Sequence, residues 1–280
     1  MTQQPIKVDA SSLIQKFGEE ERPPGIACAY AGPTMVGKTR YALTWPGNHT
    51  FAFGHNDSTH KAHGTGFPYT RPNLISGHPL NWTEKVLPAI RARAFDAKTL
   101  IFDDFDMYTT FLVMDMWKGV GKDARKDLWT PVLNRVAPEI EALTAVKFPD
   151  LVKPDLPYYN VVFTFGEIQR TNEAGQVQKI EPTIGGQSKM VLLRAMDITL
   201  ICERKMVDRQ EQVMVELQGK QTMQSRYVKA EKYTVHTIPP DNLRAYGGDR
   251  LGGGGKFKKL PAQLDDGFYS TLCDGWGIGE

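Results

Sequence analysis

The stretch from Gly32 to Thr39 reads GPTMVGKT and follows directly on the apolar run IACAYA at residues 26–31. Its spacing fits the pattern G-x-x-x-x-G-K-[ST], in which backbone N–H groups curl around an anion and the next helix adds its positive N-terminal end. There the Lys38 ammonium reaches the β- and γ-phosphates of a nucleotide, and the Thr39 hydroxyl binds Mg²⁺. The stretch therefore predicts a phosphate-binding loop, whose residues would be Gly32, Pro33, Thr34, Met35, Val36, Gly37, Lys38, Thr39 and Arg40.

A Mg-nucleotide site also needs a carboxylate at the end of a neighbouring strand, because the metal takes oxygen ligands and keeps part of its water shell. The run LIFDD at residues 100–104 is apolar and ends in two acids. Asp103 is therefore the predicted metal-shell residue, beside Thr39. We expect ATP and Mg²⁺ as the cofactors.

The general base that would orient a water for in-line attack on the γ-phosphate has two candidates. Asp104 directly follows the metal carboxylate, where many ATPases carry a glutamate. Asp57 lies just past the apolar run TFAFG at residues 50–54, and would sit beside the phosphate loop if that strand neighbours the first. Either carboxylate has the chemistry that this role requires, so the residues leave both open.

The elements that must position these residues alternate between apolar runs and helical stretches. Strands are expected near 26–31, 50–54, 99–103, 159–166 and 197–203. These runs lack the alternation of apolar and polar residues that is typical of strands with one solvent-exposed face. Such a pattern is typical of strands that are covered on both faces. It predicts an α/β fold with a mostly parallel central sheet, helices on both faces and antiparallel strands near the C-terminus.

Prolines and polar runs modify the helices and loops of this prediction. Pro88 should kink or break the helix over residues 82–96, and two prolines should divide residues 128–146 into two shorter helices. The polar stretch that follows residue 166 is expected to be a loop. We expect an N-terminal arm, a nucleotide-binding domain and a glycine-rich basic tail, over residues 1–24, 25–246 and 247–280.

The composition excludes some functional classes. The 280 residues carry a formal net charge of only +2, so any surface for nucleic acid must be local. No apolar run reaches the ~18 residues of a membrane span, and three widely spaced cysteines suit buried thiols in a reducing compartment. We expect a cytoplasmic protein without a membrane partner.

Two further stretches resemble the RecA-like recombinase core of the P-loop NTPases. They read VVFTFGEIQR at 161–170 and EPTIGGQSKMVLLRAMDITLICER at 181–204. In that family a strand ends in a polar nucleotide-sensing residue and a mobile DNA-binding loop follows. The resemblance places the sensing residue at Glu167 or Gln169.

The same resemblance extends to two shorter stretches. TFAFGHND at 50–57 resembles the family's second strand, and its catalytic carboxylate would fall on Asp57, which favours Asp57 slightly over Asp104. The family carries glutamate there, so the substitution by aspartate puts the hydrolysis rate in question. YVKAEK at 227–232 resembles a basic segment that reaches a neighbouring subunit's nucleotide, which nominates Lys229 and Lys232.

Compact size and a sparse N-terminal arm make the chain most similar to phage-encoded single-strand-annealing ATPases of the Sak type, which are labelled AAA. The resemblance covers residues 25–235. It implies a Mg-dependent ATPase that binds single-stranded DNA during phage recombination or replication, by annealing or strand exchange. It also implies a homo-oligomeric ring or filament in the host cytoplasm, with a single-strand-binding protein as a further partner.

Single-strand binding needs a basic groove with aromatic platforms. The basic candidates lie in loops of the predicted fold and are Lys118, Lys122, Arg125, Lys126, Arg170, Lys179 and Lys189, with Arg250, Lys256, Lys258 and Lys259 in the tail. Trp117, Trp129 and Phe257 lie near these charges.

Two other functions fit the same motifs. One is an AAA-like loader or motor that acts on a protein partner, in which Arg194 or Arg204 would reach a neighbour's γ-phosphate. The other is a nucleotide-gated binding module with little hydrolysis, because an aspartate stands where the base is usually glutamate.

Overall fold

The computed structural model describes residues 25–53, 82–118, 120–121, 129–150, 153, 155–185, 187–217, 220–249 and 260–264. Within these residues the chain forms an eight-stranded sheet with the order β10-β8-β7-β1-β4-β3-β2, and β9 pairs with β7. The predicted arm over 1–24 and most of the predicted tail lie outside the described residues. The predicted division into domains therefore stays a prediction.

The centre of the sheet is parallel and buried. It contains β1 (Ala27–Ala31), β2 (Asn48–Ala52), β3 (Thr99–Asp103), β4 (Asn160–Phe165) and the first residues of β7 (Ile198–Leu217). Every residue of β1 and β3 is buried, as expected for strands that helices cover on both faces. The predicted α/β class with a mostly parallel sheet is confirmed.

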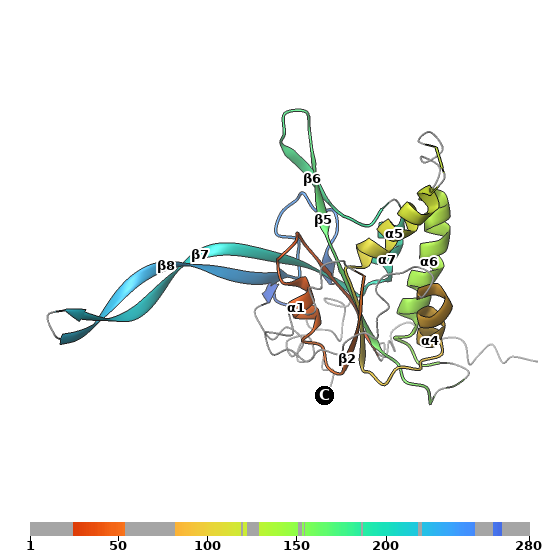
Figure 1. The fold of residues 1–280 in the computed structure, drawn as a ribbon, viewed down its shortest axis with the longest axis horizontal. Helices are drawn as coiled ribbons and strands as arrows, with labels where there is room; N and C mark the ends of the chain where they lie inside the picture. The colour runs from red at the N-terminus through yellow and green to blue at the C-terminus, as the bar shows by residue number, and fades with distance from the viewer. Residues whose placement is uncertain are drawn as a thin grey trace, which may run out of the picture.

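Helices lie on both sides of this sheet (Figure 1). On one side α1 (Lys38–Ala42) follows the phosphate loop, and Trp45 behind it donates from Nε1 to the Tyr30 hydroxyl at 3.0 Å. The other side carries α4 (Leu87–Arg91), α5 (Phe105–Trp117), α6 (Trp129–Ala145) and α7 (Ser188–Ala195). A buried cluster rich in aromatic rings lies between these helices and the strands.

Proline acts differently from the prediction in two helices. A single π-helical turn, Trp82–Val86, leads into α4. Pro88 lies in the first turn of α4, where the backbone N–H groups make no hydrogen bond within the helix, so proline is tolerated there. The two helices predicted over 128–146 are one continuous helix, α6, which runs through Pro138. Val136 and Ile140 on either side of Pro138 are fully buried, so packing offsets the lost backbone hydrogen bond.

Antiparallel hairpins complete the structure. β7 pairs with β8 (Lys220–His236) from Ile201↔His236 out to Leu217↔Lys220, and this ribbon projects far from the body (Figure 1). The polar stretch predicted as a loop instead forms the hairpin of β5 (Glu167–Thr171) and β6 (Val177–Pro182). The short strands β9 (Gly248–Asp249) and β10 (Gln263–Leu264) pair with β7 and β8.

The described part of the chain contains no helix that is both long enough and apolar enough to cross a membrane.

Candidate nucleotide-binding site

The phosphate loop leaves the carboxyl end of β1 and enters α1, and two glycines set its path. A Cβ at Gly32 would lie 2.6 Å from the carbonyl oxygen of Cys202 on β7, so the backbone passes β7 too closely for any side chain. Gly37 has φ 88°, in the left-handed region that favours glycine. Met35, between them, is 71% exposed at the outer turn of the loop. Glycine at these two positions is therefore a requirement of geometry.

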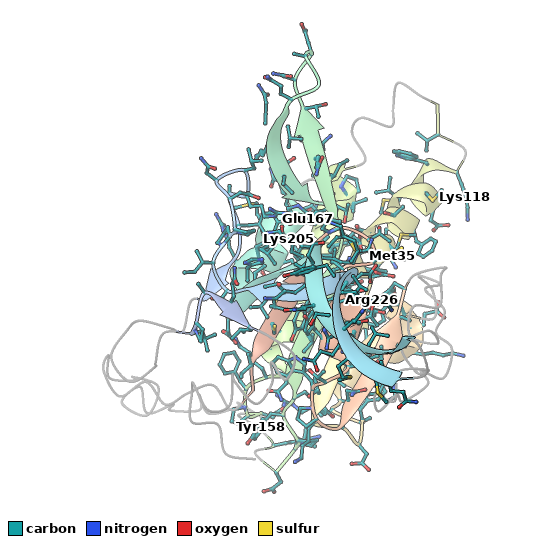
Figure 2. The ribbon with its side chains drawn as sticks, turned by 90° about the vertical axis from the view of Figure 1, so that its left-hand side faces the viewer. Met35, Lys118, Tyr158, Glu167, Lys205 and Arg226 are labelled. Carbon is teal, nitrogen blue, oxygen red and sulfur yellow. The ribbon has the colours of Figure 1, made fainter. Side chains whose placement is uncertain are left out.

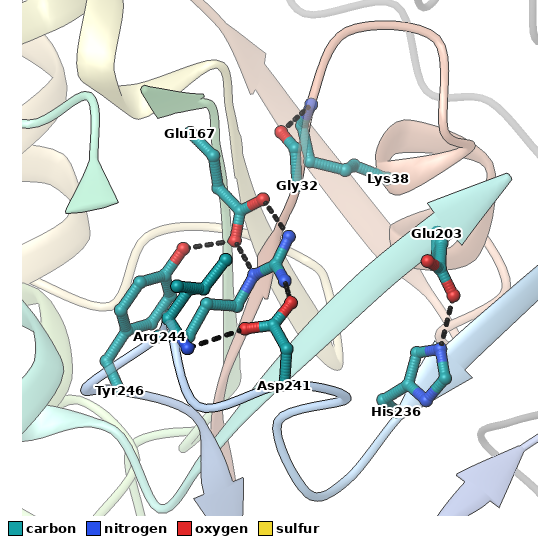
Figure 3. Close-up of polar contacts among 9 residues, drawn as sticks. Gly32, Lys38, Glu167, Glu203, His236, Asp241, Arg244 and Tyr246 are labelled. Carbon is teal, nitrogen blue, oxygen red and sulfur yellow. Dashed lines mark hydrogen bonds and ion pairs between the residues drawn. The ribbon is translucent and has the colours of Figure 1, made fainter. Parts of the chain in front are cut away.

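Lys38 folds back into this loop. Its ammonium donates hydrogen bonds to the carbonyl oxygen of Gly32 at 3.0 Å (Figure 3) and to that of Pro33 at 2.7 Å. The side chain is only 8% exposed. The loop therefore surrounds a positive charge at the point where the motif predicts the β- and γ-phosphates.

The predicted metal ligands meet at the mouth of the loop. The Thr39 hydroxyl donates to the Asp103 carboxylate, with distances of 2.9 and 3.1 Å to its two oxygens. Asp103 ends β3 and is 1% exposed. A hydroxyl and a carboxylate are oxygen donors of the kind that Mg²⁺ prefers. The donor set therefore fits Mg²⁺, and Thr39 and Asp103 are the residues that would hold it.

Thr164 is a site residue that the sequence reasoning missed. It is fully buried on β4, and its hydroxyl donates to Asp103 at 2.7 Å and accepts from the Asp104 backbone N–H at 2.8 Å. The available signal was a lone hydroxyl in the apolar run VVFTF at 161–165. The structure therefore gives Asp103 two hydroxyl donors, from α1 and from β4.

Asp104 lies beside this pair and directly precedes α5. Its backbone has φ 55°, in the left-handed region that aspartate tolerates better than most residues. Burial raises the pKa of its carboxyl to about 7, and the charges of Asp103 and Asp106 act in the same direction while Lys38 opposes them. Asp57, the other predicted base, lies outside the described residues, so both candidates for the base stay open.

Asp106 and Thr183 clamp the end of β4. The Asp106 carboxylate accepts from the Gly166 backbone N–H at 3.2 Å and from the Thr183 hydroxyl. A Cβ at Gly166 would lie 2.9 Å from the Thr183 hydroxyl oxygen, so any side chain there would have to displace Thr183. These contacts tie the strand that carries Thr164 to α5 and to the segment before α7.

The two candidates for the sensing role, Glu167 and Gln169, lie in different surroundings. The Glu167 side chain is 2% exposed and its carboxylate binds the Arg244 guanidinium at 2.7 and 2.9 Å, while the Tyr246 hydroxyl also donates to it (Figure 3). Gln169 is exposed on β5. The sensing role of either residue stays a prediction, whereas Thr164, one residue before the end of β4, is the polar residue of this segment that contacts the metal-shell carboxylate.

The basic candidates for DNA contact are spread over separate surfaces. Lys118 follows α5 and pairs with Asp115 at 2.8 Å. Three others converge on Glu181 of β6, at 3.3, 2.8 and 2.8 Å from Arg170, Lys179 and Lys189. Hydrogen bonds from Lys179 and Lys189 lower the pKa of Glu181 to about 2. The candidates Lys122, Arg125, Lys126, Arg250, Lys256, Lys258 and Lys259 lie outside the described residues.

The residues predicted to act on a neighbouring subunit fall into two groups. Arg204, Lys229 and Lys232 all lie on the β7–β8 ribbon, where Arg204 pairs with Glu231 at 3.1 Å and Lys229 with Asp208 at 3.0 Å. Arg194 lies in the last turn of α7. Their roles at a neighbouring subunit's nucleotide stay predictions.

Comparison with known proteins identifies the family. Residues 25–243 match a family described as an AAA domain. Among solved structures, a KaiC-like protein from the hyperthermophilic archaeon Pyrococcus horikoshii is similar at 10% identity and a TM-score of 0.35, over 78% of this chain and 88% of that one. No curated protein matches the chain. The family match spans most of the chain and includes the phosphate loop, Asp103 and Thr164, so the chain belongs to the AAA domain family of P-loop NTPases.

Proposed function

We propose that this chain is a Mg-dependent ATPase of the RecA-like type that acts on single-stranded DNA. The observation that carries the ATPase part is the contact of the Thr39 hydroxyl with the Asp103 carboxylate at 2.9 Å, at the mouth of a loop that surrounds the Lys38 ammonium. Three groups that a Mg-nucleotide requires, a cation for phosphate and two oxygen donors for the metal, are thus contributed by the phosphate loop and the end of β3.

Each residue has a defined task in this proposal. Lys38 exchanges its contacts with the Gly32 and Pro33 carbonyls for phosphate oxygens, and Thr39 and Asp103 hold the metal, which neutralises charge on the β- and γ-phosphates when bound. Thr164 keeps the Asp103 carboxylate in place. Asp104 or Asp57 orients the attacking water, with Asp57 favoured by resemblance.

Support for the DNA part comes from the path of the chain beyond β4. Thr164 contacts the metal-shell carboxylate, and three residues later Glu167 begins the exposed β5–β6 hairpin. That hairpin carries Arg170 and Lys179, while Lys189 joins them at Glu181. The residue that contacts the metal-shell carboxylate is therefore only a few positions along the chain from a basic surface. This short connection suits a DNA affinity that depends on the bound nucleotide. We further propose a homo-oligomer and the phage single-strand-annealing role.

ATP hydrolysis with and without single-stranded DNA tests the proposal. We expect Mg-dependent turnover that rises with DNA, and DNA affinity that falls with salt and depends on ATP. Lys38→Ala should abolish both responses, while Lys153→Ala, which removes an exposed lysine elsewhere, is the matched control. DNA affinity that ignores both salt and ATP would refute the DNA part, and absence of turnover would refute the ATPase part.

The mixed charges of the exposed surfaces also fit an alternative function. Glu181 neutralises part of the basic group on the hairpin, and the ribbon of β7 and β8 carries acids beside its bases. Such surfaces also suit a protein partner, as in an AAA-like loader or motor. Stimulation of turnover by a replication protein, with no response to single-stranded DNA, would favour this alternative over an ATPase that acts on DNA.

A further inference from the structure

The longest element of the structure, β7, extends well beyond the central sheet together with β8. We call residues 203–217 of β7 and 220–234 of β8 the arm, which is distinct from the N-terminal segment predicted over residues 1–24. β7 pairs with β1 only through Ile198–Ile201 in the described residues, and the fifteen residues from Glu203 to Leu217 pair with β8 alone. At about 3.3 Å per residue the arm is about 50 Å long. Figures 1 and 2 show it leaving the body with both faces open.

A two-stranded ribbon of this length needs a partner surface. Isolated ribbons are marginally stable in water because two strands bury little apolar area. Four large apolar side chains on the arm are nevertheless exposed: Met206 by 57%, Met214 by 62%, Met223 by 57% and Tyr227 by 75%. Large exposed apolar side chains that gather on one element mark an interaction site.

The register places these four side chains on one face of the arm. Met214 pairs directly with Met223, and Gln210 pairs with Tyr227. Since successive side chains of a strand alternate between faces, Met206, Gln210 and Met214 share a face, and their cross-strand partners share it too. We call this the methionine face.

The charges on the methionine face identify the kind of partner. Lys229 pairs with Asp208 at 3.0 Å, and Arg204 pairs with Glu231 at 3.1 Å, so each base already has an acid beside it. A polyanion would have to compete with these acids. A surface with the same mixture of charges would complement them, because a two-fold axis brings each acid toward the base of the other copy.

The size of the face fits the same partner. A ribbon about 50 Å long and about 10 Å wide presents roughly 500 Å² on one face. Two such faces packed together bury roughly 1,000 Å², which is the area that a specific interface needs to clear. A second arm supplies this area with matching shape, matching apolar side chains and complementary charges.

We propose that the arm is the surface through which two copies of this chain associate, methionine face against methionine face. This deepens the proposed homo-oligomer and rests on it, but it requires neither DNA binding nor ATP hydrolysis. The methionines suit the role because their flexible, polarisable side chains adapt to an opposing copy of themselves.

The test is the mass of the full-length protein in solution, by sedimentation over a range of concentrations. The wild type should associate, and Met214→Lys with Met223→Lys should weaken the dissociation constant by ~10-fold or more, because each complex would bury four ammonium groups. Met114→Lys is the matched control, since Met114 is equally exposed, at 57%, but lies on α5. It should leave the mass unchanged.

Two results would overturn the proposal. One is a wild type that stays monomeric at tens of micromolar; the other is a double variant that associates as tightly as the wild type. A second variant that closes the hairpin with Asn-Gly in place of residues 207–230 guards against a local effect of the lysines. ATP turnover and DNA binding are measured on the same samples. Loss of association with retained turnover supports the arm, whereas lost DNA affinity with retained association would assign the arm to DNA and refute the proposal.

Discussion

The Thr39 hydroxyl lies 2.9 Å from the Asp103 carboxylate, although β4 separates the strand that leads to Thr39 from the strand that ends at Asp103. Thr164 of β4, the strand between them, donates its hydroxyl to the same carboxylate at 2.7 Å. The site is thus built across three strands, and the middle strand contributes a positioning residue.

Thr164→Val should impair both folding and hydrolysis. The change keeps the shape of the side chain but removes a donor from buried Asp103 and an acceptor from the Asp104 N–H. We expect a loss of ~1–3 kcal/mol in the free energy of unfolding, because buried polar groups lose their partners. Turnover of Mg-ATP should fall by ~10-fold or more, since the metal carboxylate loses its orientation.

Thr144→Val is the matched control for this variant. Its hydroxyl is also buried, but it bonds to the Ile140 carbonyl within α6, away from the phosphate loop. It should change stability with no effect on turnover. Equal turnover in the two variants would contradict a positioning role for Thr164.

Gly32→Ala should damage the phosphate loop. The new Cβ would lie 2.6 Å from the Cys202 carbonyl oxygen, and neither backbone can move without disturbing the sheet. We expect ~1–3 kcal/mol of destabilisation and weaker nucleotide binding, measured by chemical unfolding and by calorimetry with Mg-ATP. Gly121→Ala, which meets no atom within 4 Å, should behave as the wild type. Normal nucleotide affinity in Gly32→Ala would show that the loop tolerates a side chain.

The raised pKa of Asp104 makes the stability of the metal-free protein depend on pH. Below about pH 4 the Asp104 carboxyl is neutral in both the folded and the unfolded chain, so burying it does not reduce the free energy of unfolding. As pH rises through about 7, the folded state must hold a buried carboxylate beside Asp103, and the free energy of unfolding falls.

Asp104→Asn should therefore gain stability relative to the wild type as pH rises from 5 to 8. Allowing for partial exposure to solvent, the gain should reach ~1–2 kcal/mol. The measurement is urea unfolding in EDTA, with Asp155→Asn, which removes an exposed charge, as the control. A constant difference between Asp104→Asn and the wild type across this range would show that the carboxyl titrates normally.

Glu167→Gln should destabilise the protein because it removes the charge of the carboxylate that binds the Arg244 guanidinium at two nitrogens, and among the described residues only Asp241 then pairs with this cation. The Glu167 and Arg244 side chains are 2% and 10% exposed, so we expect a loss of ~1–3 kcal/mol in the free energy of unfolding. Glu167→Gln with Arg244→Met should recover part of this loss, since the buried guanidinium is then removed as well. The midpoint of chemical unfolding measures the effect. Unchanged stability with a large fall in turnover would instead support the sensing role predicted from resemblance.

The phosphate loop, the metal carboxylate and the parallel sheet were predictable because each depends on local pattern. Glycine spacing after an apolar run determines how the backbone can curl, and uninterrupted apolar runs determine which strands are covered on both faces. Asp103 was found by the same logic, as an acid at the end of a buried run. These features need no knowledge of which segments meet in space.

The tertiary structure decided the rest, because the deciding contacts join residues far apart in the chain. Only packing shows that Thr164 rather than Glu167 contacts Asp103, since Glu167 is held by Arg244 from 77 positions away. Pro138 predicted a break that the buried face of α6 overrides. The arm was visible in the sequence only as scattered strand-like runs. Its length follows from an uninterrupted register between β7 and β8, which is a property of two strands together.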